Sequence, residues 1–153
     1  MILLPEIMRK KPRPAYRKPE AVKELERLAD LQAQRSHPTV DKKYLAPRKF
    51  RDDRASGLTA CIVKYATLQG SFASRLNNMG VFRNRKYTRP TSRRGLPDIL
   101  ITKDGKSLFV EVKAGRDKLS SFQRKVQEEQ TESGGLYMVA NSFAEFKVWF
   151  DAI

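Results

Sequence analysis

The chain has 153 residues, 40% of them hydrophobic, which is enough for one domain with a modest core. Its one cysteine, Cys61, and one histidine, His37, exclude an internal disulfide and a zinc site of cysteine and histidine ligands, so a bound metal would need oxygen ligands. The net charge of +14 predicts contact with a polyanion, of which nucleic acid is the usual one.

The first third of the chain is basic and contains one predicted helix. Residues 1–18 are rich in proline, lysine and arginine, and we expect them to form a basic arm without regular structure. A helix is predicted over 19–34, because a proline suits its first position and apolar residues recur at helical spacing. A basic loop follows over 36–54, and a domain boundary near residue 54 would separate this arm and helix (1–54) from a compact domain (55–153).

The remainder alternates predicted helices and strands. Helices are expected over 58–68, 119–133 and 143–152, and the last two begin with capping-box patterns, Ser120 with Gln123 and Ser142 with Glu145. Strands are expected over 71–78, 81–82, 96–102, 107–113 and 136–140, with a turn at 77–80 and a basic loop over 83–94. This order predicts an α/β fold in which helices flank a mixed central β-sheet.

Asp104-Gly105 predicts a two-residue turn between the strands expected over 96–102 and 107–113. In the register that this turn sets, Lys103 faces Lys106, and continuing along the strands places Asp98 opposite Glu111. Lys113 lies two residues beyond Glu111 and emerges on the same face. Two carboxyl groups so close would raise the pKa of at least one of them, unless a cation lies between them. The other face is apolar and should meet a helix; it consists of Ile99, Ile101, Leu108, Val110 and Val112.

The same charges also allow a simpler interpretation. Glu111 and Lys113 would form an ordinary surface ion pair, and Asp98 would be a turn residue after Pro97. A longer turn would shift the register and separate Asp98 from Glu111.

An ordered set of short motifs resembles the PD-(D/E)xK nuclease superfamily and, over about residues 58–150, the VRR-NUC family of virus-type replication-repair nucleases. The resemblance implies a restriction-endonuclease-like core. The motifs are RLNNMG at 75–80, GLPD at 95–98, EVK at 111–113, Leu119-Ser120 with Gln123, and Gly134-Gly135 before a closing helix.

The resemblance implies a Mg²⁺- or Mn²⁺-dependent phosphodiesterase that acts on DNA. Asp98 and Glu111 would bind the metal together with the backbone carbonyl of Val112. Lys113 would orient or activate the attacking water and stabilise charge on the phosphate. Gln123 matches a motif glutamine near the site, although it equally fits the capping box, and the two roles can coexist.

One position departs from the family pattern. Family members carry a glutamate at the start of the first core helix, which would fall near Ala55, yet no acidic residue occurs over 55–95. Asp52 and Asp53 are the nearest substitutes, if that helix starts early. Without them the site has two side-chain ligands, or a second chain completes it.

The resemblance also implies a structure-specific endonuclease in DNA repair or recombination, including phage enzymes that resolve Holliday junctions as homodimers. Phe146, Val148, Trp149 and Phe150 would form part of a dimer interface or pack the last helix on the sheet. A nucleic-acid-binding protein without strong catalysis, and a virion or assembly protein, are the alternatives. Phosphate contacts are expected from Arg75, Asn77, Asn78, Arg83, Arg85, Lys86, Arg89, Arg93 and Arg94.

The expected location follows from the absence of membrane signals in the sequence. No apolar run is long enough to span a bilayer, and the start of the chain lacks the pattern of a signal peptide. We therefore expect a soluble cytoplasmic protein with no membrane partner, in the cytoplasm of a bacterial host if the chain is viral.

Overall fold

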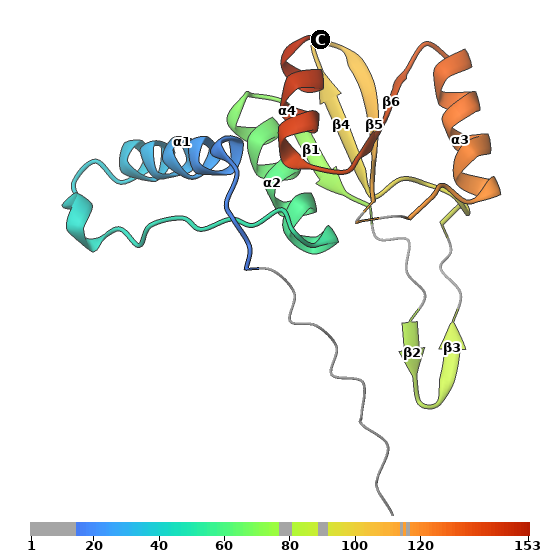
Figure 1. Ribbon diagram of the computed structural model, residues 1–153, viewed down its shortest axis with the longest axis horizontal. Coiled ribbons are helices and arrows are strands. Elements are labelled where there is room, and N and C mark those ends of the chain that lie inside the picture. The colour runs from blue at the N-terminus through green and yellow to red at the C-terminus, as the bar shows by residue number, and fades with distance from the viewer. Residues whose placement is uncertain (1–14, 77–80, 89–91, 114, 116) are drawn as a thin grey trace, which may run out of the picture.

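The fold is a central sheet with helices on both faces (Figure 1), seen in a computed structural model that describes residues 15–76, 81–88, 92–113, 115 and 117–153. The predicted turn at 77–80 and residues 1–14 of the predicted arm lie outside the described residues. The helices are α1 (Glu20–Ser36), α2 (Ala55–Leu68), α3 (Ser121–Glu132) and α4 (Phe143–Asp151), with a short 3-10 helix η1 (Lys42–Tyr44) after α1.

The sheet has four strands in the order β1-β4-β5-β6, and β5 and β6 are its only parallel pair in the described part of the chain. The predicted α/β class with a mixed, helix-flanked sheet is confirmed. A separate two-stranded sheet is formed by β2 and β3. The strands are β1 (Phe72–Arg75), β2 (Val81–Arg83), β3 (Lys86–Thr88), β4 (Ile99–Lys103), β5 (Lys106–Val112) and β6 (Leu136–Ala140).

The β4–β5 hairpin has the predicted register. Lys103 pairs with Lys106, and the ladder continues to Ile99 with Val110. Asp104 and Gly105 adopt φ angles of 49° and 75°, the left-handed conformation that a tight turn of this kind requires. Because side chains alternate along a strand, this register places Ile99, Ile101, Leu108 and Val110 together on the buried face, while Leu100 and Phe109 pair on the opposite face and are half-buried.

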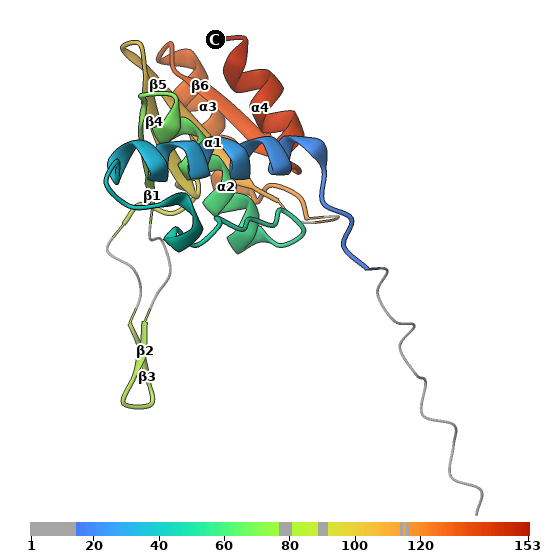
Figure 2. The ribbon, with the colours of Figure 1, turned by 90° about the vertical axis from the view of Figure 1, so that its left-hand side faces the viewer.

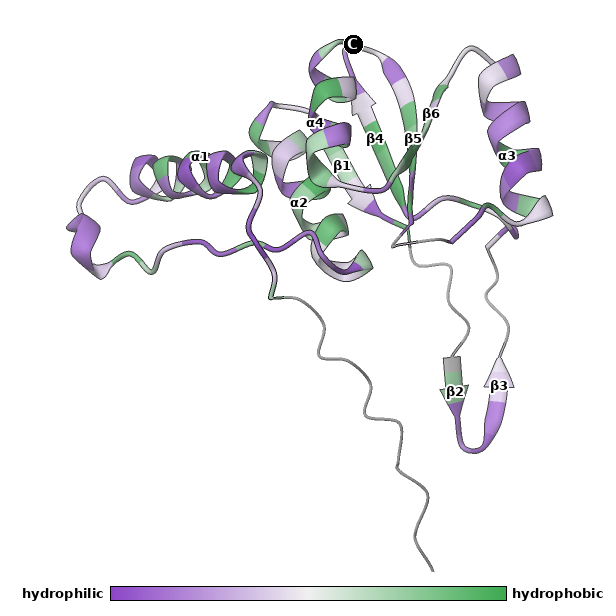
Figure 3. Cartoon of the chain, viewed as in Figure 1, coloured by the Kyte–Doolittle hydropathy of each residue, from purple (hydrophilic) through white to green (hydrophobic). Residues whose placement is uncertain are grey.

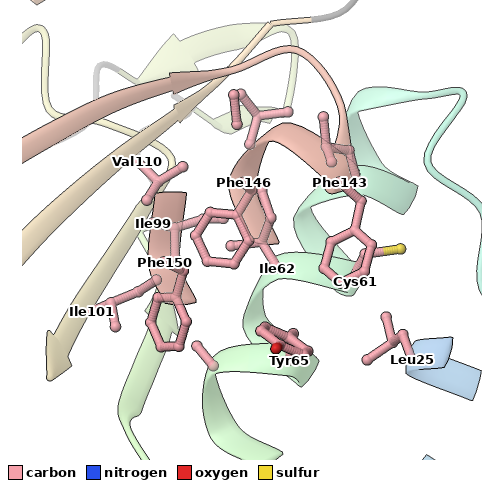
Figure 4. Close-up of a cluster of buried hydrophobic side chains, with 14 of the residues drawn as sticks. Leu25, Cys61, Ile62, Tyr65, Ile99, Ile101, Val110, Phe143, Phe146 and Phe150 are labelled. Carbon is pink, nitrogen blue, oxygen red and sulfur yellow. The ribbon is translucent and has the colours of Figure 1, made fainter. Parts of the chain in front are cut away.

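That apolar face meets α2 and α4, which form the core with it. Ile99, Ile101, Leu108 and Val110 are fully buried. They pack in one cluster with the phenylalanines of α4 and with Ile62 of α2 (Figure 4). Burial of such side chains contributes roughly 1.5–3 kcal/mol each, so this face is the main source of stability.

α1 packs on the same core through Val22 and Leu25, which are both fully buried. Figure 2 shows α1 and α2 together in front of the sheet, with α3 behind it. The division of the chain at residue 54 stays a prediction. No helix in the described residues is both long enough and apolar enough to cross a membrane.

Several predicted elements differ from the structure, and within the strand predicted over 71–78 the observed β1 covers Phe72–Arg75. α2 begins at Ala55, three residues before the predicted start at 58, and β4 begins at Ile99 instead of 96. The basic segment predicted as a loop over 83–94 contains strand β3, because Asn84 and Arg85 adopt φ angles of 51° and 60° and turn the chain back on itself. An asparagine–arginine pair is not a typical signal for such a turn, whose usual second residue is glycine.

Candidate active site

The candidate site lies at the end of the β4–β5 hairpin opposite its turn. Asp98 directly precedes β4, and its carboxylate Oδ2 accepts a hydrogen bond from the backbone N–H of Val112 at 2.8 Å. The ladder therefore stops at Ile99, because a side chain takes the place of the next main-chain partner. The register, continued by one pair beyond Ile99 and Val110, sets Asp98 opposite Glu111, and the charge of Asp98 acts on Glu111, which agrees with the prediction that they are cross-strand neighbours.

Glu111 is the buried acid of the site, with 4% of its side chain exposed. Lys113 Nζ lies 3.0 Å from Glu111 Oε1, as expected for residues on one face of a strand. Burial raises the pKa of Glu111, the hydrogen bond from Lys113 opposes this rise, and the charge of Asp98 adds to it. The predicted pKa direction is confirmed, but its first cause is loss of solvent and not the neighbouring carboxylate.

Gln123 joins α3 to these charges. Its side-chain Nε2 donates to Glu111 Oε1, and its Oε1 accepts from Lys113 Nζ at 3.2 Å. The same Oε1 accepts from the backbone N–H of Ser120 at 2.9 Å, and Ser120 Oγ accepts from the backbone N–H of Gln123 at 3.2 Å. The capping box and the contact with the site therefore coexist in one side chain.

At α4 the structure shows one half of the second predicted capping box. Ser142 Oγ accepts from the backbone N–H of Glu145 at 3.2 Å. This contact fixes where α4 begins, beside the end of β6.

Two buried oxygen atoms near the site have no hydrogen-bond partner. They are Oε2 of Glu111 and the hydroxyl of Tyr137 on β6. Burial raises the pKa of Tyr137, and the charges of Glu111 and Asp98 raise it further. Tyr137 was missed by sequence reasoning, because its place on the face of Glu111 follows only from the parallel register of β5 and β6. A buried polar atom without a partner is costly unless a ligand supplies one.

Asp52 and Asp53, the candidate substitutes for the missing helix glutamate, both bind residues outside the site. The Asp52 carboxylate accepts from the Tyr16 hydroxyl at 2.8 Å and from the backbone N–H of Phe143 at 3.3 Å. Asp53 forms an ion pair with Arg51 at 2.7 Å. Across the residues that the structure describes, no group of three or more histidine, cysteine, aspartate or glutamate side chains could hold a metal.

The donors that are present still fit a small hard cation. Mg²⁺ keeps several waters in proteins and is commonly held by one or two carboxylates, so Asp98 and Glu111 are a sufficient side-chain set. The unpartnered Oε2 of Glu111 is the atom that such an ion would engage. The Val112 carbonyl as a further ligand stays a prediction.

The predicted phosphate-binding residues fall into three groups. Asn77, Asn78 and Arg89 lie outside the described residues. Arg93 forms an ion pair with Glu129, and the Arg94 guanidinium lies 5.5 Å from the ring centre of Phe122. The charge of Arg93 is therefore partly balanced within the protein. The third group consists of Arg75 on β1 and Arg83, Arg85 and Lys86 on the β2–β3 hairpin, which are all exposed.

The residues considered for a dimer interface pack mainly into the core. Phe146 and Phe150 are buried, and Trp149 packs against the same cluster. Only Val148 of this group is well exposed, at 73%. The homodimer stays a prediction, and three of its four proposed contact residues have a folding role.

Comparison with known proteins identifies the family. The family model for the VRR-NUC domain matches residues 48–144, a segment that contains Asp98, Glu111, Lys113 and Gln123. No curated protein and no solved structure matches the chain at a significant level. The match covers more than half of the chain and includes the hairpin, α3 and the start of α4, so the chain belongs to the VRR-NUC family.

Proposed function

We propose that this protein is a Mg²⁺- or Mn²⁺-dependent endodeoxyribonuclease that hydrolyses phosphodiester bonds in branched DNA. Its nuclease-type domain implies a nucleic-acid substrate. The observation that carries the proposal is the arrangement of Asp98, buried Glu111 and Lys113 at one end of a rigid hairpin. Fixed side chains of opposite charge in one place suit a reaction at a phosphate.

The two carboxylates would hold the cation, with the Val112 carbonyl as a main-chain ligand. A bound Mg²⁺ ion lowers the pKa of coordinated water and shields the charge of the phosphate. Asp98 is held in place by the N–H of Val112, and Glu111 by Lys113 and Gln123. Ligands that are fixed before binding lose little conformational entropy when the ion enters.

Lys113 would stabilise the negative charge that builds on the phosphate during attack by water. Its ammonium group is kept at the site by Glu111 Oε1 and Gln123 Oε1. A lysine so held acts as a positioned positive charge, the kind of group whose removal costs on the order of 10²–10³ in rate. Gln123 is a positioning residue in this mechanism.

The preference for branched DNA rests on the resemblance to standalone nucleases of this family. Two symmetric cuts across a four-way junction need two sites, which a homodimer would supply. The net charge of +14 supports tight, salt-dependent binding to DNA phosphates.

The test is a cleavage assay with matched variants. The full chain is incubated with Mg²⁺ or Mn²⁺ and four-way junction, nicked, flapped or plain duplex DNA. We expect cleavage of branched DNA by the wild type and loss of at least about 100-fold for Asp98→Asn and Lys113→Ala. Asp104→Asn and Lys106→Ala change the same residue types at the other end of the hairpin and should cut normally.

Two results would contradict the proposal. Absence of cleavage by the wild type in either metal would exclude the nuclease, and cleavage that survives both site substitutions would exclude these residues. Binding of DNA without cleavage would favour a second function, that of a nucleic-acid-binding protein on a nuclease fold. The specific observation in its favour is that the described residues contain no third acid at the site.

A further inference from the structure

The β2–β3 hairpin stands apart from the four-stranded sheet in both ribbon views (Figures 1 and 2). In the chain it lies between Arg75 and Ile99, which pair with each other at the end of the sheet next to Asp98. The hairpin therefore leaves the body of the protein at the same end as the candidate active site.

The hairpin has one aromatic face and one cationic face. Phe82 and Tyr87 are directly opposite in the register, so their side chains lie on the same face. Arg83 pairs with Lys86 on the other face, and Arg85 occupies the turn. Figure 3 shows hydrophobic colour within β2 and hydrophilic colour around the turn.

The two rings contribute nothing to the core. Phe82 is 70% exposed and Tyr87 is 58% exposed, and neither belongs to the hydrophobic cluster. An isolated two-stranded hairpin is marginally stable in water, and one cross-strand pair of rings adds only about 0.2–1 kcal/mol. Such residues at the tip of a projecting element indicate a binding surface.

The charge around the rings identifies the partner. The sequence from residue 75 to 94 has seven arginines and lysines and no acidic residue. A partner must therefore combine dense negative charge with flat apolar surfaces. Single-stranded nucleic acid has both, because its phosphates are charged and its unpaired bases expose faces on which aromatic rings stack. In a continuous duplex those faces are already stacked on one another.

We propose that the β2–β3 hairpin binds the unpaired nucleotides at the branch point of a DNA substrate. Phe82 and Tyr87 stack on the exposed bases, while Arg83, Arg85 and Lys86 contact the adjacent phosphates. The inference rests on the proposed function, since it names the part of a branched DNA that the nuclease holds beside its site.

The test measures binding and not cleavage, so it runs with a chelator in place of the metal. Fluorescence anisotropy of the full chain is recorded with forked DNA, single-stranded DNA and a continuous duplex of equal length. Phe82→Ala/Tyr87→Ala should bind forked and single-stranded DNA at least about tenfold more weakly, because each lost base stack costs on the order of tenfold. Its affinity for the duplex should change less than about twofold, since duplex binding depends on phosphate contacts.

The matched control is Tyr44→Ala/Phe72→Ala, which removes one tyrosine and one phenylalanine that are 74% and 61% exposed elsewhere. It should bind all three DNAs like the wild type. Phe82→Trp/Tyr87→Trp keeps the stacking surfaces and should restore forked-DNA affinity, which separates loss of stacking from loss of the hairpin. A 2-aminopurine base at the branch should lose fluorescence with the wild type and keep it with the alanine variant.

Several outcomes would overturn the inference. Base stacking is contradicted if the alanine variant binds as tightly as the wild type, or if its affinity falls equally for duplex DNA. It is also contradicted if the tryptophan variant fails to bind. Tighter binding to RNA of the same sequence would replace DNA as the partner. If the wild type cleaves but the hairpin variant binds normally, only this inference fails. If the rings bind forked DNA but no metal supports cleavage, only the proposed nuclease activity fails.

Discussion

Two hairpins in this protein have the same kind of turn and opposite surroundings. The β4–β5 turn has Asp104 and Gly105 at φ angles of 49° and 75°, and the β2–β3 turn has Asn84 and Arg85 at 51° and 60°. β1 and β6 extend the first hairpin into a sheet with a buried face. The second hairpin pairs only with itself, and both of its rings are exposed.

The difference shows that a turn sets the register of a hairpin, while the contacts on its faces decide what the hairpin does. Packing on both sides makes β4–β5 rigid, so it can hold Asp98, Glu111 and Lys113 in fixed positions. Reactions at a phosphate need such fixed positions. The β2–β3 hairpin lies outside the hydrophobic core, and its Phe82 and Tyr87 side chains are exposed to solvent instead.

The sharpest test of the comparison is to shorten one side chain to alanine in each hairpin. Leu108→Ala in β5 should lower the free energy of unfolding by about 2–5 kcal/mol, because Leu108 is fully buried and its loss leaves a cavity. Tyr87→Ala in β3 should change it by less than about 0.5 kcal/mol, as for other exposed residues. Urea unfolding followed by circular dichroism measures both. Similar losses in the two variants would show that β3 is part of the folded core.

The next prediction concerns Gln123, through which α3 contacts the charged residues at the end of the β4–β5 hairpin. Gln123→Ala should reduce cleavage of branched DNA by roughly 10–100-fold, because residues that orient metal ligands typically contribute that much. It also removes half of the capping box. Ser120→Ala removes the other half without touching Glu111 or Lys113, and it should cut DNA at close to the wild-type rate. Equal cleavage rates for the two variants would show that Gln123 acts only as a helix cap.

A substitution in the β4–β5 turn should have a smaller effect on stability. Gly105 has a φ of 75° and open space around the position of a Cβ atom, so Gly105→Ala adds backbone strain and no clash. We expect a loss of about 1 kcal/mol in the free energy of unfolding. Arg85→Gly places a glycine at the corresponding position of the exposed hairpin and should leave global unfolding unchanged. A loss in Arg85→Gly equal to that in Gly105→Ala would contradict the difference between the hairpins.

The smallest effect is a pH dependence at Glu111. Burial raises the pKa of this carboxyl group above its usual value of 4.5, and the charge of Asp98 adds to the rise against the opposing effect of Lys113. A carboxyl group with a higher pKa in the folded protein contributes stability at low pH, and this contribution is lost as the pH rises through the folded pKa. Without metal, the melting temperature of Glu111→Gln relative to that of the wild type should therefore increase as the pH rises.

Thermal unfolding in a chelator at about pH 4.5 and about pH 8 measures this difference. A matched substitution of an exposed glutamate, Glu20→Gln, should show no such trend with pH, since its side chain is 85% exposed. A constant difference between Glu111→Gln and the wild type would contradict the pH linkage.

Local signals predicted much of the fold. Asp104-Gly105 predicted the β4–β5 register, and Ser120 with Gln123 predicted the start of α3, because a tight turn and a helix cap depend on residues close in sequence. The alternation of side chains along one strand predicted the contact of Lys113 with Glu111. β3 was not predicted, because its turn residues, Asn84 and Arg85, are atypical.

The missed features of the site depend on contacts between distant segments. Asp98 bonds the N–H of Val112, so the ladder stops one pair early. Tyr137 reaches the site because β6 runs parallel to β5, a pairing that no turn specifies. Asp52 was a candidate ligand by its place in the sequence, but Tyr16 and the start of α4 engage its carboxylate.

The sequence by itself determined the family, the α/β class, the hairpin register and the three charges at its end, since these follow from motifs and short-range periodicity. Only the tertiary structure decided which acids meet, that Gln123 serves both its helix and the site, and that one hairpin is buried while the other is exposed. The physical reason is that burial depends on which distant surfaces pack together. The chemistry of Glu111 and the exposure of Phe82 both depend on that packing.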